Sequence, residues 1–267
     1  RTKLGQLGIF MPSAAIHPLR PGMPRPWVIA HRGSSAHAPE NSLRAFALAA
    51  AAGVDACETD VRLSADCIPV LCHDPDLLRV AGRREQVATW KASALNALAL
   101  QDRNGFVWPE EGIPRLDVAL RLHPHMTFFL EMKADGMHDA RAKRQLAETT
   151  ARYALEAIAA GVTAPILLSF EQDLLDMAAC IAPELYTARN LLSPCNTATD
   201  LVSCAIGSVT ASFVAQQHHV GKAVLAFTVN HPEELQFALA CKIDGLFCDD
   251  PTWLLQQLDQ HLGKIQP

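Results

Sequence analysis

From residue 27 onward, short apolar runs alternate with longer segments of helical character, and this alternation constrains the fold more than any other feature. The apolar runs, which we predict to be strands, are 27–31, 55–62, 68–72, 127–132, 165–169, 184–188, 207–211, 223–228 and 244–248. Most of them are separated by predicted helices, at 41–53, 138–161, 171–181, 233–241 and 252–262. Apolar strands that alternate with helices are typical of a parallel sheet covered by helices.

The number of strands favours a closed barrel. Eight or nine strands in a chain of this length fit a TIM (β/α)8 barrel, an α/β fold, better than an open sheet. No linker or low-complexity tract divides the chain, so we predict one barrel domain over residues 26–267. Residues 1–25 are rich in Pro and Gly, lack an apolar core long enough for a signal peptide, and are predicted to be a flexible leader.

Two places break the alternation. Only four residues separate "VRL" from "IPVLCHD", which is too few for a crossover helix and indicates a hairpin. The segment at about 75–115 shows little periodicity and is too long for a plain loop. We therefore predict a small insertion after the third strand, of a kind that is often functional on such scaffolds.

Composition and charge limit the partners. The net charge of −5, without any run of Lys or Arg, argues against nucleic-acid binding, so an anionic substrate would need local cations or a metal. The eight cysteines are scattered without zinc spacing, which favours free thiols in a reducing, cytoplasmic location. No apolar stretch is long enough to span a membrane, and we expect no stable membrane insertion.

Ionisable residues gather at the ends of four consecutive predicted strands. Residues two apart on a strand point to the same face, and barrel enzymes build their active sites at the C-terminal strand ends. One charged residue at a strand end can simply mark where the strand meets water, but four strands in succession favour a site. The residues are His31 and Arg32, Glu58 and Asp60, His73 and Asp74, and Glu131 and Lys133.

These residue types suit one chemistry. Glu58, Asp60 and Glu131 are hard oxygen ligands for one divalent cation, Mg²⁺ or Ca²⁺, and without a cation their charges would repel. Two histidines can act as general base and general acid near neutral pH. Arg32 and Lys133 supply positive charge for an anionic oxygen. Together they match the requirements of phosphoester cleavage.

Six blocks, in this order and spacing, resemble the glycerophosphodiester phosphodiesterase family: "HRG…APENS", "ETD", "IPVLCHD", "LEMK", "LLSF" and "FTVN…DGLFCDDP". The resemblance covers residues 27–252 and is closest to the compact cytosolic bacterial members. It implies a TIM barrel with an insertion after the third strand. It also implies hydrolysis of small-molecule glycerophosphodiesters, such as glycerophosphocholine or glycerophosphoethanolamine, to sn-glycerol 3-phosphate and an alcohol.

The resemblance assigns roles by position. It implies that His31 and His73 are catalytic, that Glu58, Asp60 and Glu131 hold the metal, and that Arg32 and Lys133 bind substrate. The "PEN" element, with Glu40 and Asn41, is expected to fix its loop and cap the following helix. Near the eighth strand, Phe227 and Asn230 are predicted pocket residues, although Phe227 stands where the family usually has Trp or Tyr. The segment after "HD" lacks the family's Thr-x-Gly pattern, which leaves selectivity for the alcohol open.

Two other functions compete. A related phosphodiesterase of lysophospholipids or sphingolipids would need an exposed apolar rim beside the barrel mouth, and none is evident in the sequence. A non-catalytic barrel that serves as a binding module is disfavoured because all seven site groups are present. The sequence leaves open the choice of Mg²⁺ or Ca²⁺, the head group, which histidine is the base, the nucleophile (water or the substrate 2-hydroxyl) and the oligomeric state.

Overall fold

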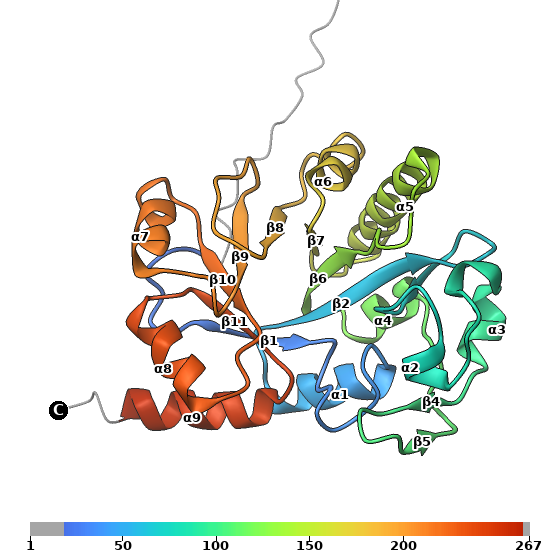
Figure 1. The fold of residues 1–267 in the computed structure, drawn as a ribbon, viewed down its shortest axis with the longest axis horizontal. Helices are drawn as coiled ribbons and strands as arrows, with labels where there is room; N and C mark the ends of the chain where they lie inside the picture. The colour runs from blue at the N-terminus through green and yellow to red at the C-terminus, as the bar shows by residue number, and fades with distance from the viewer. Residues whose placement is uncertain (1–18, 264–267) are drawn as a thin grey trace, which may run out of the picture.

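The structure, a computed structural model, describes residues 19–263 and has a closed barrel of eight parallel strands at its centre (Figure 1). In the order in which they pair, the strands are β1 (Trp27–His31), β11 (Gly245–Cys248), β10 (Val224–Phe227), β9 (Leu201–Ala205), β8 (Thr187–Leu191), β7 (Ile166–Ser169), β6 (Thr127–Met132) and β2 (Ala56–Leu63). Pairing of β1 with β2 closes the ring. The predicted TIM barrel is confirmed.

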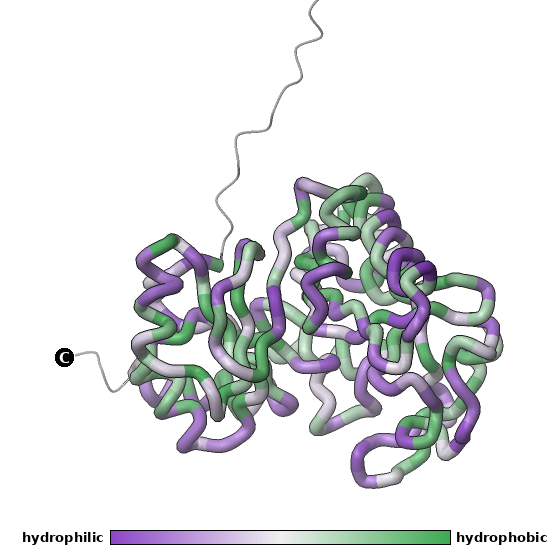
Figure 2. The backbone as a smooth tube through the Cα atoms, turned by 45° about the horizontal axis from the view of Figure 1, so that its top comes forward, coloured by the Kyte–Doolittle hydropathy of each residue, from purple (hydrophilic) through white to green (hydrophobic). Residues whose placement is uncertain are grey.

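Helices surround the barrel. Those that cover it within residues 19–263 are α1 (Leu43–Ala52), α4 (Leu116–Leu122), α5 (Ala140–Ala159), α6 (Gln172–Ala179), α7 (Ala211–His219), α8 (Pro232–Ala240) and α9 (Pro251–Gly263). In Figure 2 the colour along these helices alternates between hydrophilic and hydrophobic. On α5, for example, Leu146, Thr150 and Ala154 are buried at four-residue spacing, so one face of the helix packs on the strands.

Two predicted strands were misplaced. We predicted 184–188 and 207–211, but β8 begins three residues later, and β9 ends before the second range begins. The apolar runs there are longer than a strand, so the pattern does not fix which residues pair. Thr210 lies inside the second range, and its hydroxyl accepts a hydrogen bond from the Phe213 N–H as the N-cap of α7. Within the described chain, β8 and β9 are joined by a loop without a helix.

The predicted hairpin and insertion are present. β3 (Pro69–Leu71) pairs antiparallel with the far end of β2, and the Cys72 N–H donates to the Asp60 carbonyl, so the chain returns to the barrel mouth. The insertion that follows gathers on one side of the barrel (Figure 1) around its own apolar cluster, which includes Leu77 and Leu95. It contains α2 (Leu78–Ala81), the 3₁₀ helix η1 (Val87–Thr89), α3 (Ala92–Asn96), β4 (Leu100–Gln101) and β5 (Val107–Trp108).

Apolar side chains fill the barrel interior. Ile29, Phe129 and Phe247 belong to one buried cluster, which also contains Leu19. Residues 1–18 of the predicted leader lie outside the described residues. The described part of that leader packs on the barrel, since Leu19 is buried and Arg25 forms an ion pair of 2.6 Å with Asp55. The packed structure therefore begins before the predicted boundary at residue 26.

The cysteines and the helices bear on two further expectations. All eight cysteines, which lie within the described residues, are free thiols. Burial raises the pKa of the Cys72 thiol to about 12, which keeps it protonated and unreactive. Among the described helices, none is both long and apolar enough to cross a lipid bilayer. The cytoplasmic location stays a prediction.

Candidate active site

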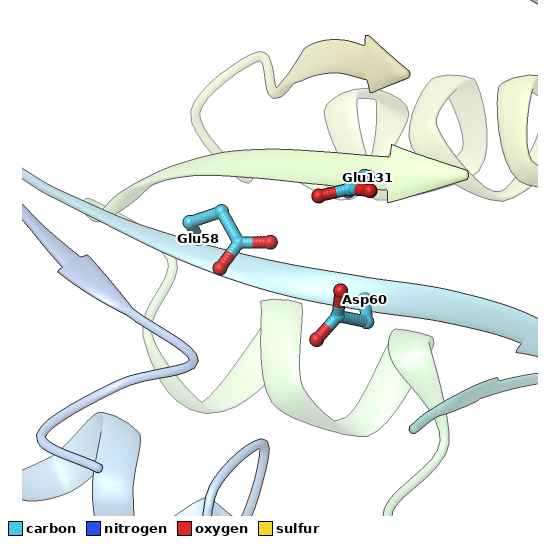
Figure 3. Close-up of side chains that lie close together, drawn as sticks. All are labelled: Glu58, Asp60 and Glu131. Atoms are coloured by element: carbon cyan, nitrogen blue, oxygen red, sulfur yellow. The ribbon is translucent and has the colours of Figure 1, made fainter. Parts of the chain in front are cut away.

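Three carboxylates meet at the mouth of the barrel. Glu58 and Asp60 lie on β2, and Asp60 pairs in register with Glu131 on β6. The potential ligand oxygens of the three side chains all lie within 4.8 Å of one another. Figure 3 shows the carboxylates of the two strands turned toward one another. The predicted cluster is therefore brought together by the alternation of side chains along two paired strands.

The cluster fits a divalent cation. Glu58 Oε1 and Asp60 Oδ1 are buried and have no hydrogen-bond partner among the described residues. Burial, together with the neighbouring Asp60 and Glu131 carboxylates, raises the pKa of Glu58 well above its ordinary value. Burial and Asp60 likewise raise the pKa of Glu131. Asp60 Oδ1 also lies 3.7 Å from Lys133 Nζ. Both oxygens could serve as ligands of a cation at this point, and the cation would offset the repulsion that opposes ionisation.

Asp60 differs from the two glutamates. Burial alone would raise the pKa of Asp60, but the positive charges of Arg32, His73 and Lys133 lower it below its ordinary value. The Asn41 amide donates to Asp60 Oδ2 at 2.9 Å, and the Asn41 carbonyl oxygen accepts from the Asp60 N–H. Asn41 thus fixes one carboxylate of the cluster in addition to its loop. The expectation that the "PEN" residues cap the helix is wrong, since the cap of α1 is Ser42.

Two cations flank the carboxylates. Arg32 directly follows β1 in a left-handed conformation (φ 59°), and its backbone N–H donates to Glu58 Oε2 at 3.0 Å. Its guanidinium lies 3.0 Å from Glu40 Oε1 and 3.1 Å from Asp60 Oδ2. Lys133 Nζ donates to Glu131 Oε1 at 2.8 Å. Both cations line the pocket at the mouth, as predicted.

His31 is backed by a carboxylate that the sequence analysis missed. Its Nδ1 lies 2.8 Å from Asp249 Oδ1, which leaves Nε2 for the pocket that His31 lines. Asp249 Oδ2 accepts from Asn230 Nδ2 at 3.0 Å and from Arg103 Nη2 at 2.8 Å. Burial opposes the ionised form of Asp249, but His31 and Arg103 outweigh it and lower the pKa of Asp249. Asn230 was predicted to line the pocket, but it lies behind Asp249. It is not among the described residues that line the pocket.

His73 has an equivalent partner close by in the sequence. Its Nδ1 lies 2.6 Å from Asp74 Oδ1, and Arg79 Nε donates to Asp74 Oδ2 at 2.7 Å. Arg79 also forms a close ion pair with Glu40, which binds Arg32 as well. Burial opposes ionisation of Asp74, but hydrogen bonds from Arg79 and His73 lower its pKa to about 2. In both histidines, Nδ1 therefore contacts the carboxylate of an ionised aspartate.

The pocket has one charged half and one apolar half. The apolar half consists of Leu168, Phe170, Phe227 and Phe247, from β7, β10 and β11 or the residues just after them. Phe170 and Phe227 pack edge to face with ring centroids 5.8 Å apart. At the ends of the neighbouring strands β7 and β8, Phe170 is 37% exposed and Leu192 is 69% exposed. Phe170, which lines the pocket, therefore offers a partly exposed apolar surface at the mouth.

Phosphate esters are the substrates that suit this mouth. Its two cationic side chains can neutralise phosphate charge directly, and its carboxylates could hold a metal that does the same. The two histidines can transfer protons. The fold and the site thus define a barrel hydrolase of phosphate esters. Residues 31–252 match the family model described as the glycerophosphoryl diester phosphodiesterase family. The chain belongs to that family.

Individual relatives agree. A glycerophosphodiester phosphodiesterase of Caldanaerobacter subterraneus subsp. tengcongensis is 25% identical over 238 residues, which cover 85% of this chain and 96% of the relative. An Oleispira antarctica phosphodiesterase, solved with the product sn-glycerol-3-phosphate, aligns with a TM-score of 0.75 and 25% identity over 88% of this chain and 97% of its own. A Silicibacter pomeroyi protein proposed to be such an enzyme aligns with a TM-score of 0.84 and 25% identity over 93% of this chain and 98% of its own.

Proposed function

We propose that the protein hydrolyses glycerophosphodiesters, such as glycerophosphocholine and glycerophosphoethanolamine, to sn-glycerol 3-phosphate and the free alcohol. One divalent cation, Mg²⁺ or Ca²⁺, would be held by Glu58, Asp60 and Glu131. The observation that carries this proposal is the pair of buried carboxylate oxygens without a hydrogen bond among the described residues, at a mouth lined by two histidines that each contact an aspartate. When bound, the cation would withdraw charge from a phosphoryl oxygen and lower the pKa of a nearby hydroxyl.

The chain's own residues divide the remaining work. Each histidine has Nδ1 on an aspartate, so Nε2 is the atom that exchanges protons with the substrate. One histidine accepts the proton of the attacking hydroxyl, and the other donates a proton to the departing alcohol oxygen. Arg32 and Lys133 stabilise the negative charge on the phosphate oxygens. The apolar half of the pocket contacts the carbon atoms of the substrate.

The nucleophile in this proposal is the hydroxyl on C2 of the glycerol, which gains a high effective concentration because it belongs to the substrate. Its oxygen bonds to phosphorus, the bond from phosphorus to the alcohol breaks, and a cyclic 1,2-phosphate of glycerol forms. Water then opens the ring with the two histidines in exchanged roles. Substrate analogues without the 2-hydroxyl should not be cleaved, and hydrolysis at the parent rate would instead favour direct attack by water.

An assay with defined substrates tests the activity. Metal-stripped protein is incubated with glycerophosphocholine in the presence of Mg²⁺, Ca²⁺ or EDTA, and glycerol 3-phosphate is measured. We expect product with a cation, none with EDTA, and none from Glu58→Gln, which removes one ligand charge. Glu148→Gln, a change on the surface of α5, is the matched control and should keep full activity. Full activity of the stripped enzyme in EDTA would refute the metal site.

The apolar surface of Phe170 favours a second candidate substrate. Phe170 lines the pocket and is partly exposed, and an acyl chain would bury it. A lysophospholipid cleaved at the same bond would yield an acylglycerol phosphate and the head-group alcohol. In the same assay, Phe170→Ala should reduce turnover of a long-chain lysophospholipid more than turnover of glycerophosphocholine. Equal effects on both would exclude a contact between Phe170 and an acyl chain.

A further inference from the structure

Two buried polar side chains inside the barrel each have an oxygen atom without a hydrogen-bond partner among the described residues. Asn190 lies on β8 and Ser203 on β9, and the two residues are paired in register. Asn190 is 5% exposed and Ser203 is fully buried. Asn190 Oδ1 and Ser203 Oγ form no hydrogen bond with any described residue. Because an unmade buried hydrogen bond is costly, such a pair needs a physical reason.

The other end of the Asn190 amide reaches the proposed metal site. Asn190 Nδ2 donates to Glu131 Oε2 at 3.2 Å, across the intervening strand β7. The second oxygen of the same carboxylate, Oε1, accepts from Lys133. Since an ionised carboxylate only accepts hydrogen bonds, the NH₂ group of Asn190 must face Glu131, and its carbonyl oxygen must face away. Glu131 is therefore fixed from two sides.

The strand register places a candidate donor for Asn190 Oδ1 on the neighbouring strand β9. Side chains at successive paired positions point to the same side of neighbouring strands, so Ser203 stands next to Asn190 inside the barrel. Nearby interior positions on β7, β9 and β10 are the apolar Leu168, Leu201 and Leu225. A hydroxyl can donate one hydrogen bond, and a change of the Ser203 side-chain rotamer would be needed to bring it to the amide oxygen.

We propose that Ser203, Asn190 and Glu131 form a positioning chain: the Ser203 hydroxyl donates to the Asn190 carbonyl, and the Asn190 amide holds the third carboxylate in the orientation that binds the cation. This inference rests on the metal site proposed above. In this proposal Asn190, which also lines the pocket, and Ser203 are positioning residues that act through Glu131. Partners of this kind orient metal ligands in many proteins, and their loss weakens metal affinity.

Cation binding by the metal-stripped protein tests the proposed positioning chain without relying on enzyme activity. Titration calorimetry with Mg²⁺ and Ca²⁺ compares wild type with Asn190→Leu, which preserves bulk but cannot hydrogen-bond to Glu131. We expect the dissociation constant to rise about 10-fold to 100-fold. Ser203→Ala should raise it on the order of 5-fold, as for one lost hydrogen bond. Asn190→Ala, which adds no bulk, makes the same comparison if the leucine variant does not fold.

The matched control is Thr150→Val. Thr150 on α5 carries another buried, unpartnered hydroxyl, but it lies in the packing between helix and barrel wall, and its loss should leave cation affinity unchanged. Because Ser203 acts through Asn190, Ser203→Ala should have no further effect in the Asn190→Leu background. The proposed positioning chain would be refuted if the Asn190 variants bound the cation with unchanged affinity. It would also be refuted if Ser203→Ala had the same effect in the wild type and in Asn190→Leu. Failure of the wild type to bind any cation would instead refute the metal site.

Discussion

The two histidines of the site are held by different kinds of structure. His31 ends β1, and its partner Asp249 follows β11, 218 residues later in the chain. His73 follows β3, and its partner Asp74 is the next residue. The first pair forms only when the barrel closes, whereas the second forms within one hairpin and the insertion that follows it.

The insertion nevertheless supports both pairs. Arg103, in the turn between β4 and β5, donates to Asp249, and Arg79 on α2 donates to Asp74. Asp249 has a second side-chain donor in Asn230, so it keeps one if Arg103 is lost. Among the described residues, Arg79 is the one side chain besides His73 that holds Asp74. The comparison teaches that the insertion is part of the catalytic apparatus, and that His73 depends on it more than His31 does.

The largest expected effect comes from the histidines themselves. His31→Ala and His73→Ala should each lower the turnover of glycerophosphocholine by about 10²-fold to 10⁴-fold, because each removes one proton transfer. Steady-state release of glycerol 3-phosphate measures it. His123→Ala, at the end of α4, is the control and should behave as wild type. Near wild-type turnover in either variant would remove that histidine from the mechanism.

The aspartates behind the histidines should differ. Asp249→Asn and Asp74→Asn both remove the negative charge that orients the ring and stabilises its protonated form. Hydrogen bonds to charged groups contribute about 1.5–3 kcal/mol, so we expect losses in kcat of about 10-fold to 100-fold. Asp249→Asn should lie at the upper end, since that carboxylate is the better anchored. A larger loss in Asp74→Asn would reverse our ranking of the two regions.

The arginines of the insertion should have smaller effects, in the opposite order. Arg79→Ala leaves Asp74 without a second donor, and about a 10-fold loss in kcat is expected. Arg103→Ala leaves Asn230 on Asp249, and its loss should be only a few-fold. Arg83→Ala is the control from the same insertion, because within residues 19–263 the Arg83 side chain pairs with the half-exposed Glu85 and stacks on Trp90. Equal losses from Arg79→Ala and Arg103→Ala would show that the insertion supports both histidines alike.

The carboxylates between the two histidines should make cation binding depend on pH. The raised pKa of Glu58 means that the cation-free fold loses stability as pH rises above the ordinary glutamate value of 4.5. A cation binds the ionised form, so the rise in melting temperature on adding Mg²⁺ or Ca²⁺ should be larger at pH 8 than at pH 5. At about 100 times Kd, the rise should be on the order of 5 °C at the higher pH. An equal or smaller rise at pH 8 would contradict a cation bound at Glu58.

Sequence patterns predicted the parts of the site that depend on local geometry. Glu58 and Asp60 share a face because they are two apart on a strand. Asp74 was among the ionisable residues at strand ends, but its contact with His73 was not predicted. The strand-end rule then placed Glu131 with Glu58 and Asp60. These predictions needed only the period of a strand and the common direction of parallel strands.

The parts that depend on barrel closure could not be predicted. Asp249, Asn190 and Arg103 contact partners that lie 59 to 218 positions away in the sequence, and no local spacing marks such pairs. The position of β9 was mispredicted for a related reason, since two adjacent apolar runs fit a strand equally well and only the pairing with neighbouring strands distinguishes them. Asn230 was predicted to lie near the site, but its hydrogen bond to Asp249 depends on the direction of its side chain, which the sequence does not reveal.

The claim that one histidine acts as base and the other as acid is tested most directly by changing the leaving group. A glycerophosphodiester of p-nitrophenol releases an alcohol that needs no proton, so the general acid becomes dispensable for this substrate. We predict that one of His31→Ala and His73→Ala regains about 10²-fold in rate relative to its rate with glycerophosphocholine, while the other stays impaired. Recovery of both variants, or of neither, would contradict the division of roles on which this account rests.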